Sequence, residues 1–311
     1  MSKINHYIHA ATRENTRRSY QSAIEHYEAT WGGFLPATAD NIALYLSENA
    51  ETLSINTLKQ RIAALAQWHI DQGFPDPTKA SIVKKVMKGI KILHPAHEKQ
   101  ARPLQLDQLS KVISAIDLTI QEASKDNDQN TILRQLRNKA LILLGFWRGF
   151  RSDELSRLQA EYIQTIPGEG ITIFLPRTKS DHQNNGQAFK APALSRLCLV
   201  TAYTDWILAA QITKGPVFRG INRWGRLSES ALNSSSIITL MRKIFEDAGL
   251  DDSGSYSSHS LRRGFATWAS NNKWDIKSLM EYVGWKDIKS AMRYIDSNSQ
   301  EAKQRIELGF L

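Results

Sequence analysis

Two short segments in the second half of the chain place arginine and histidine at spacings that suit phosphate chemistry. In the first, Arg151 lies three residues before Glu154, at the start of an expected helix that Ser152 can cap. In the second, His259 and Arg262 are three residues apart and therefore share one side of a helical turn. A guanidinium binds two phosphate oxygens, and an imidazole moves a proton near neutral pH. Taken alone, Arg151 and Glu154 are better explained as a surface ion pair.

A third segment, residues 279–295, contains a turn between two short helices. Gly284 can end the first helix in the left-handed conformation, and Asp287 can cap the second. Tyr294 lies near the end of that second helix. A helical tyrosine is usually a core residue with its hydroxyl at the rim, so this segment alone does not indicate a nucleophile.

The composition fits a globular protein of two domains: 311 residues, 41% hydrophobic and 23% charged. A net charge of +9 favours a polyanionic partner, nucleic acid before membrane. The longest nearly uncharged apolar run, residues 140–147, is too short to cross a bilayer, and residues 1–9 lack the apolar core of a secretory signal. The single cysteine, Cys198, excludes an internal disulfide and a cysteine-built zinc site, so a cytoplasmic location is expected.

The first hundred residues are predicted to form a bundle of four helices, because apolar residues recur there at helical spacing. Thr38 can cap the second helix, and Ser54 can cap the third. Pro77 is expected to begin the fourth helix, with Ile82 among its inward residues. The same helix carries a one-sided lysine row, Lys84, Lys88 and Lys91, with no acidic residue between positions 77 and 97. A solvated helix face and a DNA-binding face both fit this row.

Residues 94–105 contain two prolines and no apolar periodicity, so we expect an exposed linker there, between a domain at 1–93 and a second at 106–311. The second domain is predicted to be mostly helical, with helices at 106–116, 131–147, 194–212, 235–248, 260–271, 275–283 and 288–296. One small sheet is expected. The runs 171–175 and 187–191 are predicted to form a β-hairpin, and Asn185-Gly186 supplies a favourable turn between them.

In order and spacing, these pieces resemble the tyrosine recombinase, or phage integrase, family. The catalytic pieces are Gly149-x-Arg-x-x-Glu154, the hairpin with Arg177-Thr-Lys179, His259-x-x-Arg262, Gly284-Trp285, and Tyr294 nine residues beyond Trp285. The pieces similar to the family's core-binding domain are Thr16-Arg-Arg-Ser-Tyr20, residues 56–64 and His69-x-x-x-Gly73-x-Pro75-x-Pro77. The resemblance covers nearly the whole chain. Trp285 and the Arg-Thr-Lys hairpin are most similar to the Cre-like simple recombinases of the family.

The resemblance implies a mainly α-helical fold with a small β-hairpin in its catalytic domain. An N-terminal, SAM-like core-binding bundle and that catalytic domain would form a C-shaped clamp on DNA. It also implies the role of each site residue: Tyr294 is the nucleophile, Arg151 and Arg262 clamp the phosphate, Lys179 protonates the leaving 5′-oxygen, His259 moves the tyrosine proton, and Glu154 orients Arg151 and His259. Trp285 can only donate its indole N–H, so proton transfer is expected to run through His259 and Lys179.

The resemblance further implies a homotetramer on two double-stranded DNA sites with inverted-repeat core sequences. The tail residues Ile306, Leu308 and Phe310 would dock on a neighbouring protomer; the alternative is a tail packed on its own domain. No metal, cofactor or membrane partner is expected. The lysine row and Arg61 are expected to face DNA, where Arg61 could bind a guanine. With the bundle beginning near Thr16, no additional arm-binding domain is expected.

Three alternatives stay open from the sequence. A type IB topoisomerase or telomere resolvase shares this chemistry, although the compact size and the helical first domain argue against it. A catalytically silent DNA-binding protein is disfavoured because every catalytic position is occupied. A metal-dependent nuclease needs clustered carboxylates, and the best candidates, Asp251 and Asp252, lie in a Gly/Ser-rich segment more typical of a turn. Neither the target sequence nor the choice between integration, excision and resolution follows from the residues.

Overall fold

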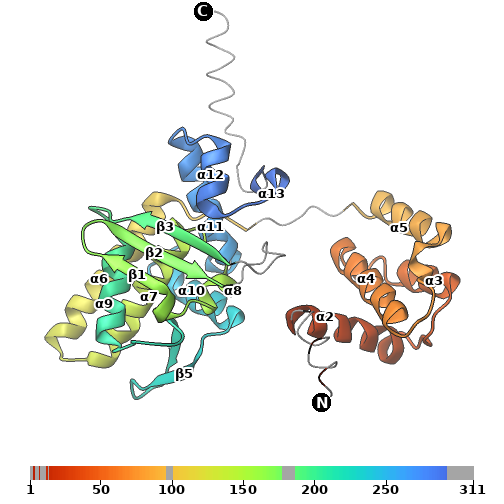
Figure 1. The fold of residues 1–311 in the computed structure, drawn as a ribbon, viewed down its shortest axis with the longest axis horizontal. Helices are drawn as coiled ribbons and strands as arrows, with labels where there is room; N and C mark the ends of the chain where they lie inside the picture. Colours follow the sequence, from red (N-terminus) through yellow and green to blue (C-terminus); the bar gives the residue numbers. More distant parts are fainter. Residues whose placement is uncertain are drawn as a thin grey trace, which may run out of the picture. The chain divides into compact units, whose positions relative to one another are not determined.

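The computed structural model describes Lys3, Tyr7, Thr12 and residues 14–95, 101–176 and 186–292. The chain divides into two compact units, Met1–Lys99 and Gln100–Leu311 (Figure 1). Each unit has a hydrophobic core of its own.

The first unit is a helical bundle, as the sequence predicts. Its elements are α2 (Glu14–Glu25), the π-helical turn η1 (His26–Thr30), α3 (Ala39–Glu48), α4 (Ile55–Asp71), the 3₁₀ turn η2 (Pro77–Lys79) and α5 (Ser81–Leu93). The Thr38 hydroxyl accepts a hydrogen bond from the Asn41 amide, and the Ser54 hydroxyl accepts one from the Thr57 amide. Both predicted helix caps are therefore confirmed.

A histidine ties two segments of this bundle together. His69 is buried on α4, and its Nε2 accepts a hydrogen bond of 2.8 Å from the amide of Ala37, just before α3. The hydrophobic core of the bundle is built from η1, α3, α4 and α5, and α2 packs partly buried residues against it. The core residues are Tyr27, Ile42, Tyr45, Leu46, Leu58, Leu65, Val83, Met87 and Ile90.

Two details of the first unit differ from the prediction. Pro77 opens the 3₁₀ turn η2 instead of α5, because the Asp76 carboxylate accepts hydrogen bonds from the Thr78 amide and hydroxyl and closes a separate turn there. The helix then begins at Ser81. Ile82, expected inward, is 42% exposed, while Val83 faces the core.

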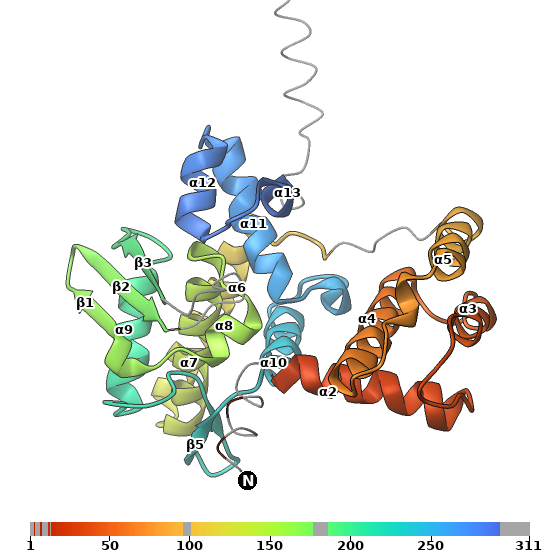
Figure 2. The same cartoon turned by 45° about the vertical axis from the view of Figure 1, so that its right-hand side comes forward.

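The second unit is mainly helical. Its helices are α6 (Leu106–Lys125), α7 (Gln129–Trp147), α8 (Ser152–Ser156), α9 (Leu199–Ala209), α10 (Ser234–Asp247), α11 (Ser258–Asn271), α12 (Ile276–Val283) and α13 (Ile288–Met292), with 3₁₀ turns η3 (Ala160–Tyr162) and η4 (Ser253–Ser255). Figures 1 and 2 both show α12 and α13 beside α11 at one end of this unit. No helix among the described residues is long and apolar enough to cross a membrane.

Two small antiparallel sheets complete this unit. The first has the order β1 (Ile163–Ile166), β2 (Gly170–Leu175) and β3 (Gln187–Pro192), and it pairs Ile173 with Phe189. The predicted β2–β3 hairpin is therefore confirmed. The second sheet, β4 (Arg219–Ile221) with β5 (Leu227–Ala231), was not predicted, and neither was β1. The prediction of a single small sheet in this unit was therefore wrong.

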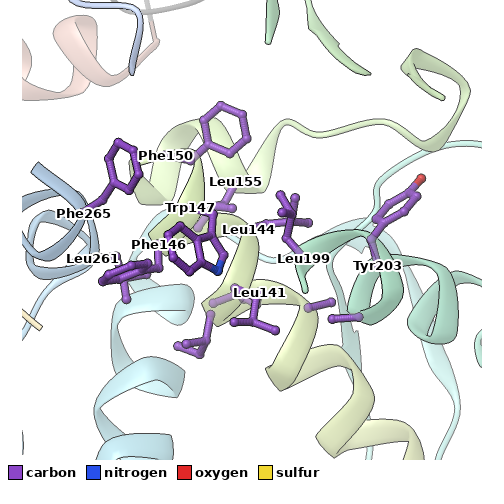
Figure 3. Close-up of a cluster of buried hydrophobic side chains, with 14 of the residues drawn as sticks. Leu141, Leu144, Phe146, Trp147, Phe150, Leu155, Leu199, Tyr203, Leu261 and Phe265 are labelled. Atoms are coloured by element: carbon purple, nitrogen blue, oxygen red, sulfur yellow. The ribbon is translucent and has the colours of Figure 1, made fainter. Parts of the chain in front are cut away.

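Helix α7 runs through the core of this unit and ends beside the predicted arginine turn. Figure 3 shows Leu144 of α7 next to Leu199 of α9, and Phe146 next to Leu261 of α11. The rings of Phe146 and Phe265 meet edge to face at 6.3 Å. This packing fixes the end of α7 against α11, so that the turn after α7 and the first half of α11 are held together.

The segment before α6 also packs on α11. Leu104, expected in an exposed linker, is fully buried, and its amide donates a hydrogen bond of 3.0 Å to the Ser260 carbonyl. A Cβ on Gly264 would lie 2.0 Å from the Leu104 carbonyl oxygen, which shows how closely the two backbones approach.

Candidate active site

The first arginine of the site lies in the turn between α7 and α8. Helix α8 begins at Ser152, which is its first helical residue and not its cap, so the predicted Ser152 cap is wrong. Glu154 closes the turn instead. One of its carboxylate oxygens accepts a hydrogen bond from the Arg151 amide, and the other accepts one from Arg151 Nη1, each at 2.8 Å.

The second arginine comes from α11. Arg262 is 1% exposed, and its Nη1 lies 3.4 Å from Glu154, which is itself buried. Its Nη2 donates a hydrogen bond of 3.2 Å to the carbonyl of Val283, the last residue of α12. One buried carboxylate thus joins arginines more than a hundred positions apart in the sequence. The Arg151–Glu154 pair is therefore not a simple surface ion pair, because Glu154 is buried and only Arg151 is partly exposed.

Two glycines with positive φ allow these segments to approach one another. A Cβ on Gly149, where φ is 57°, would lie 3.2 Å from Val283 and 3.4 Å from Arg262 side-chain atoms. Gly284 ends α12 with φ of 77°, as predicted, and a Cβ there would lie 2.9 Å from the Phe189 ring. Any larger residue at either position would push the turn away from its neighbour.

Trp285 and His259 complete the described part of the site. Trp285 is 6% exposed, and its ring centre lies 5.2 Å from Cζ of Arg262. His259 is the second residue of α11 and is exposed, one helical turn before Arg262. Its amide donates to the Ser257 hydroxyl, which caps the helix.

Two positive charges and one negative charge meet in this network, which leaves a net charge of one positive unit beside the exposed His259. Arginine presents planar pairs of N–H donors that match the oxygens of a phosphate. Because Glu154 and its hydrogen bonds hold both guanidinium groups in place, these donors are fixed before an anion arrives. The arrangement is suited to stabilising charge on a phosphate.

Two predicted catalytic residues lie outside the described residues. Lys179 belongs to the segment 177–185, between β2 and β3, and Tyr294 follows the end of α13 by two positions. The tail residues Ile306, Leu308 and Phe310 also lie outside the described part. The structure therefore brings together Arg151, Glu154, Arg262 and Trp285, with His259 on the same helix as Arg262.

The remaining candidate groups are exposed or already engaged. Lys84, Lys88 and Lys91 are all exposed on α5. Arg61 on α4 is half-buried, and its Nη1 donates a hydrogen bond of 2.6 Å to the Ser22 carbonyl, so part of its guanidinium already serves the bundle.

No group of three metal-binding side chains was found in the part of the chain that the structure describes. The carboxylate pair Asp251 and Asp252 is exposed in the turn before η4.

Sequence reasoning did not single out Arg148, which is buried at the end of α7. It follows the apolar run 140–147 and looks like an ordinary basic residue at a helix end, where a cation is favourable. Arginine rarely lies directly after an apolar run that is buried in a protein core. This position is the one signal in the sequence that could have identified Arg148.

Comparison with known proteins identifies the family. Residues 117–301, more than half of the chain, match the model of the phage integrase family. The chain belongs to this family. It is similar to the integrase/recombinase xerD homolog of Selenomonas ruminantium (29% identity, 93% of this chain and 85% of that protein) and to recombinase cre of Escherichia phage P1 (25% identity, 88% and 80%).

Solved structures agree with this at the level of the fold. The XerH site-specific recombinase in a post-cleavage complex with palindromic difH DNA has a TM-score of 0.60 and 19% identity, over 95% of this chain and 78% of that one. This phage integrase family member is a tyrosine-type site-specific recombinase, an enzyme that cuts and rejoins DNA and binds it at recombination sites. The comparisons confirm three predictions from the sequence: the family, the mainly helical fold with two domains, and the enzyme class.

Proposed function

We propose that the recombinase cleaves DNA with Tyr294 as its nucleophile. The tyrosine oxygen forms a bond to the phosphorus of the scissile phosphodiester, and the bond to the 5′-oxygen breaks. The products are a 3′-phosphotyrosine and a free 5′-hydroxyl. Because the phosphotyrosyl bond keeps the energy of the phosphodiester, a 5′-hydroxyl from another strand can reverse the step without ATP. The observation that supports this proposal is the network in which buried Glu154 joins buried Arg262 to the partly exposed Arg151, beside Trp285.

Each site residue then has a distinct role. Arg151 and Arg262 bind the non-bridging oxygens and stabilise the pentavalent transition state, while Glu154 keeps both in position. Lys179 donates a proton to the leaving 5′-oxygen, and His259 accepts or returns the tyrosine proton. Trp285 donates a hydrogen bond and transfers no proton, since an indole has only a donor. Four cationic or proton-moving groups around one phosphate make a metal ion unnecessary.

At the level of assembly, we propose a homotetramer on two DNA sites whose core sequences are inverted repeats. Residues 1–93 act as the core-binding domain, 94–105 as the linker, whose end at Leu104 packs on α11, and 106–311 as the catalytic domain, and together they enclose each half-site. The apolar tail residues Ile306, Leu308 and Phe310 dock on a neighbouring protomer. The lysine row faces DNA, and so does Arg61, with the donors that the Ser22 carbonyl does not use. The single cysteine is consistent with action in the cytoplasm.

Trapping the covalent intermediate tests the proposed chemistry. A preferred duplex is first selected from a random DNA library by binding to the full-length chain. It is then prepared as a nicked substrate series, in which the nick is moved one nucleotide at a time beyond the bound repeat. Cleavage just before the nick releases a short fragment with a 5′-hydroxyl, so the protein stays attached to the DNA.

The expected result is an adduct with the wild-type chain and with Tyr162→Phe, an exposed tyrosine in the same unit, but none with Tyr294→Phe. The Tyr294→Phe variant should bind the duplex as well as wild type does. An adduct of wild-type yield with Tyr294→Phe would refute the assignment. Two selected sites on separate DNA molecules then distinguish strand exchange from the simple relaxation that a topoisomerase performs.

A further inference from the structure

Arg148 is a buried cation without a carboxylate partner among the described residues. It is 1% exposed at the end of α7, and among the residues that the structure describes no carboxylate forms an ion pair with it. Its Nε has no hydrogen-bond acceptor among those residues. Burial lowers the pKa of the guanidinium from its usual value, but arginine keeps its charge in proteins. A neutral residue would therefore cost less in this position, which calls for a reason beyond packing.

The guanidinium joins two segments that are distant in the sequence. Its Nη1 donates a hydrogen bond of 3.1 Å to the Lys190 carbonyl in β3, and its Nη2 donates to the Tyr282 carbonyl in α12. Two aromatic rings hold it in place, with the Tyr282 ring centre 3.8 Å and the Phe189 ring centre 5.2 Å from Cζ. Such cation–π contacts are favourable when the cation is desolvated.

All three segments that meet at Arg148 lead directly to the site. The end of α7 continues through Gly149 to Arg151. The end of α12 continues through Gly284 to Trp285. Strand β3 begins two positions after the segment that contains Lys179.

The last carbonyls of α12 are held by the two arginines together. Arg148 binds the carbonyl of Tyr282, and Arg262 binds the carbonyl of the next residue, Val283. Carbonyls at a helix C-terminus carry partial negative charge, so both arginine cations stabilise this end of α12. A shift of the end of α12 away from Arg148 would therefore also move the carbonyl that Arg262 binds.

We infer that Arg148 is a positioning residue, which fixes the end of α12 and strand β3 against the Arg151 turn so that Arg262 and Trp285 hold their places at the scissile phosphate. The inference rests on the proposed function, because it assumes that Arg262 and Trp285 contact that phosphate. Arg148 itself contacts carbonyls and rings, not DNA.

Arg148→Lys tests this inference. Lysine keeps the charge but has neither the planar pair of donors that reaches two carbonyls nor the flat face that stacks between two rings. The matched control is Arg134→Lys, the same change on the same helix. Arg134 also donates to two backbone carbonyls, those of Ile221 and Asn222, but these lie in the β4–β5 sheet and the turn after β4, away from the site.

The measurement is single-turnover adduct formation on the nicked substrate at saturating protein, well below the melting temperature. Misplacement of catalytic groups by about 1 Å costs roughly a hundredfold in rate, so Arg148→Lys should react about ten to a hundred times more slowly than wild type. Its dissociation constant for the intact duplex should stay within about twofold, as for a change remote from the DNA. Arg134→Lys should match wild type in both.

A merely structural role predicts a different pattern. Loss of stability lowers the fraction of active protein and hence the adduct yield, while the rate constant of the folded fraction is unchanged. A wild-type rate constant for folded Arg148→Lys would therefore overturn the inference, and so would equal losses of rate and binding.

If Arg148→Lys does not fold, the rate constant of the Tyr282→Leu variant tests the inference in its place. It keeps the carbonyl but removes the ring under the guanidinium, and a cation–π contact of about 1 kcal/mol corresponds to a rate loss of about fivefold. A wild-type rate constant for folded Tyr282→Leu would then overturn the inference. Tyr294→Phe is measured in parallel. If that variant still forms an adduct, the proposed nucleophile is wrong, whereas the Arg148 inference is judged by the rate constants alone.

Discussion

The Glu154 carboxylate should stabilise the second unit measurably, because it forms ion pairs with two arginines, Arg151 and Arg262. Its oxygens accept three hydrogen bonds, from the Arg151 amide, from Arg151 Nη1 and from Arg262 Nη1. Glu154→Gln removes the negative charge and replaces one acceptor oxygen by an N–H₂ group that faces donors. Both guanidinium groups then lose the negative charge that Glu154 supplies.

The size of the effect follows from these contacts. Hydrogen bonds to charged groups contribute about 1.5–3 kcal/mol each, and breaking a buried ion pair by removing one partner costs about 3–5 kcal/mol. Since glutamine keeps one acceptor oxygen, we expect a loss of about 3 kcal/mol in the free energy of unfolding of this unit. For a domain of about 200 residues that lowers the melting temperature by roughly 6–12 °C.

Thermal unfolding followed by tryptophan fluorescence measures this loss. Of the eight tryptophans only Trp31 and Trp68 lie in the first unit, so the signal reports mainly on the second. The matched control is Asp153→Asn, one position earlier on α8. Asp153 pairs with Arg157, and both side chains are more than a third exposed, so its loss should cost about 1 kcal/mol or less. Equal, small shifts of the melting temperature for Glu154→Gln and Asp153→Asn would show that the Glu154 carboxylate does not stabilise this unit.

Three further predictions address the DNA face, the chemistry and the packing. Changing the whole lysine row to alanine should lower the slope of log binding constant against log salt by about 2.7, at 0.9 per phosphate contact, and an unchanged slope would mean a solvated face. Adduct formation should persist in excess EDTA, whereas loss that magnesium or manganese restores would indicate metal-dependent cleavage. Gly264→Ala should lower the melting temperature of the second unit, because the new Cβ would lie 2.0 Å from the Leu104 carbonyl oxygen and overpacking costs about 1–3 kcal/mol. The control is Gly89→Ala on α5, where a Cβ would have no neighbour within 4 Å, and this change should stabilise the first unit by about 0.5–1 kcal/mol.

Local signals in the sequence were sufficient for several elements. Thr38 and Ser54 cap their helices, and Gly284 ends α12, because each of these acts through backbone groups within four residues. The β2–β3 hairpin was also predictable, since it combines a β-branched run with a turn signal nearby.

Elements that depend on distant contacts were not predictable in this way. Strands β4 and β5 are short and polar, and arginines from α7 hold them in place: Arg134 and Arg137 donate to carbonyls of β4 and of the turn after it. The buried state of Glu154 also depends on Arg262, more than a hundred residues away. Spacing alone could suggest the Arg151–Glu154 pair but not its burial. The one local signal for Arg148, its place directly after an apolar run, does not indicate that it binds a carbonyl of α12.

The most direct test of the central claim is to identify the amino acid that carries the DNA. The adduct trapped on the nicked substrate is digested with a nuclease and with trypsin and then analysed by mass spectrometry. Trypsin cleaves after Arg293 and after Lys303, so the peptide Tyr294–Lys303 has Tyr294 as its first residue and contains no other tyrosine. The expected result is a 3′-linked nucleotide on Tyr294 in this peptide. A nucleotide on any other residue, or linkage through a 5′-phosphate, would contradict it.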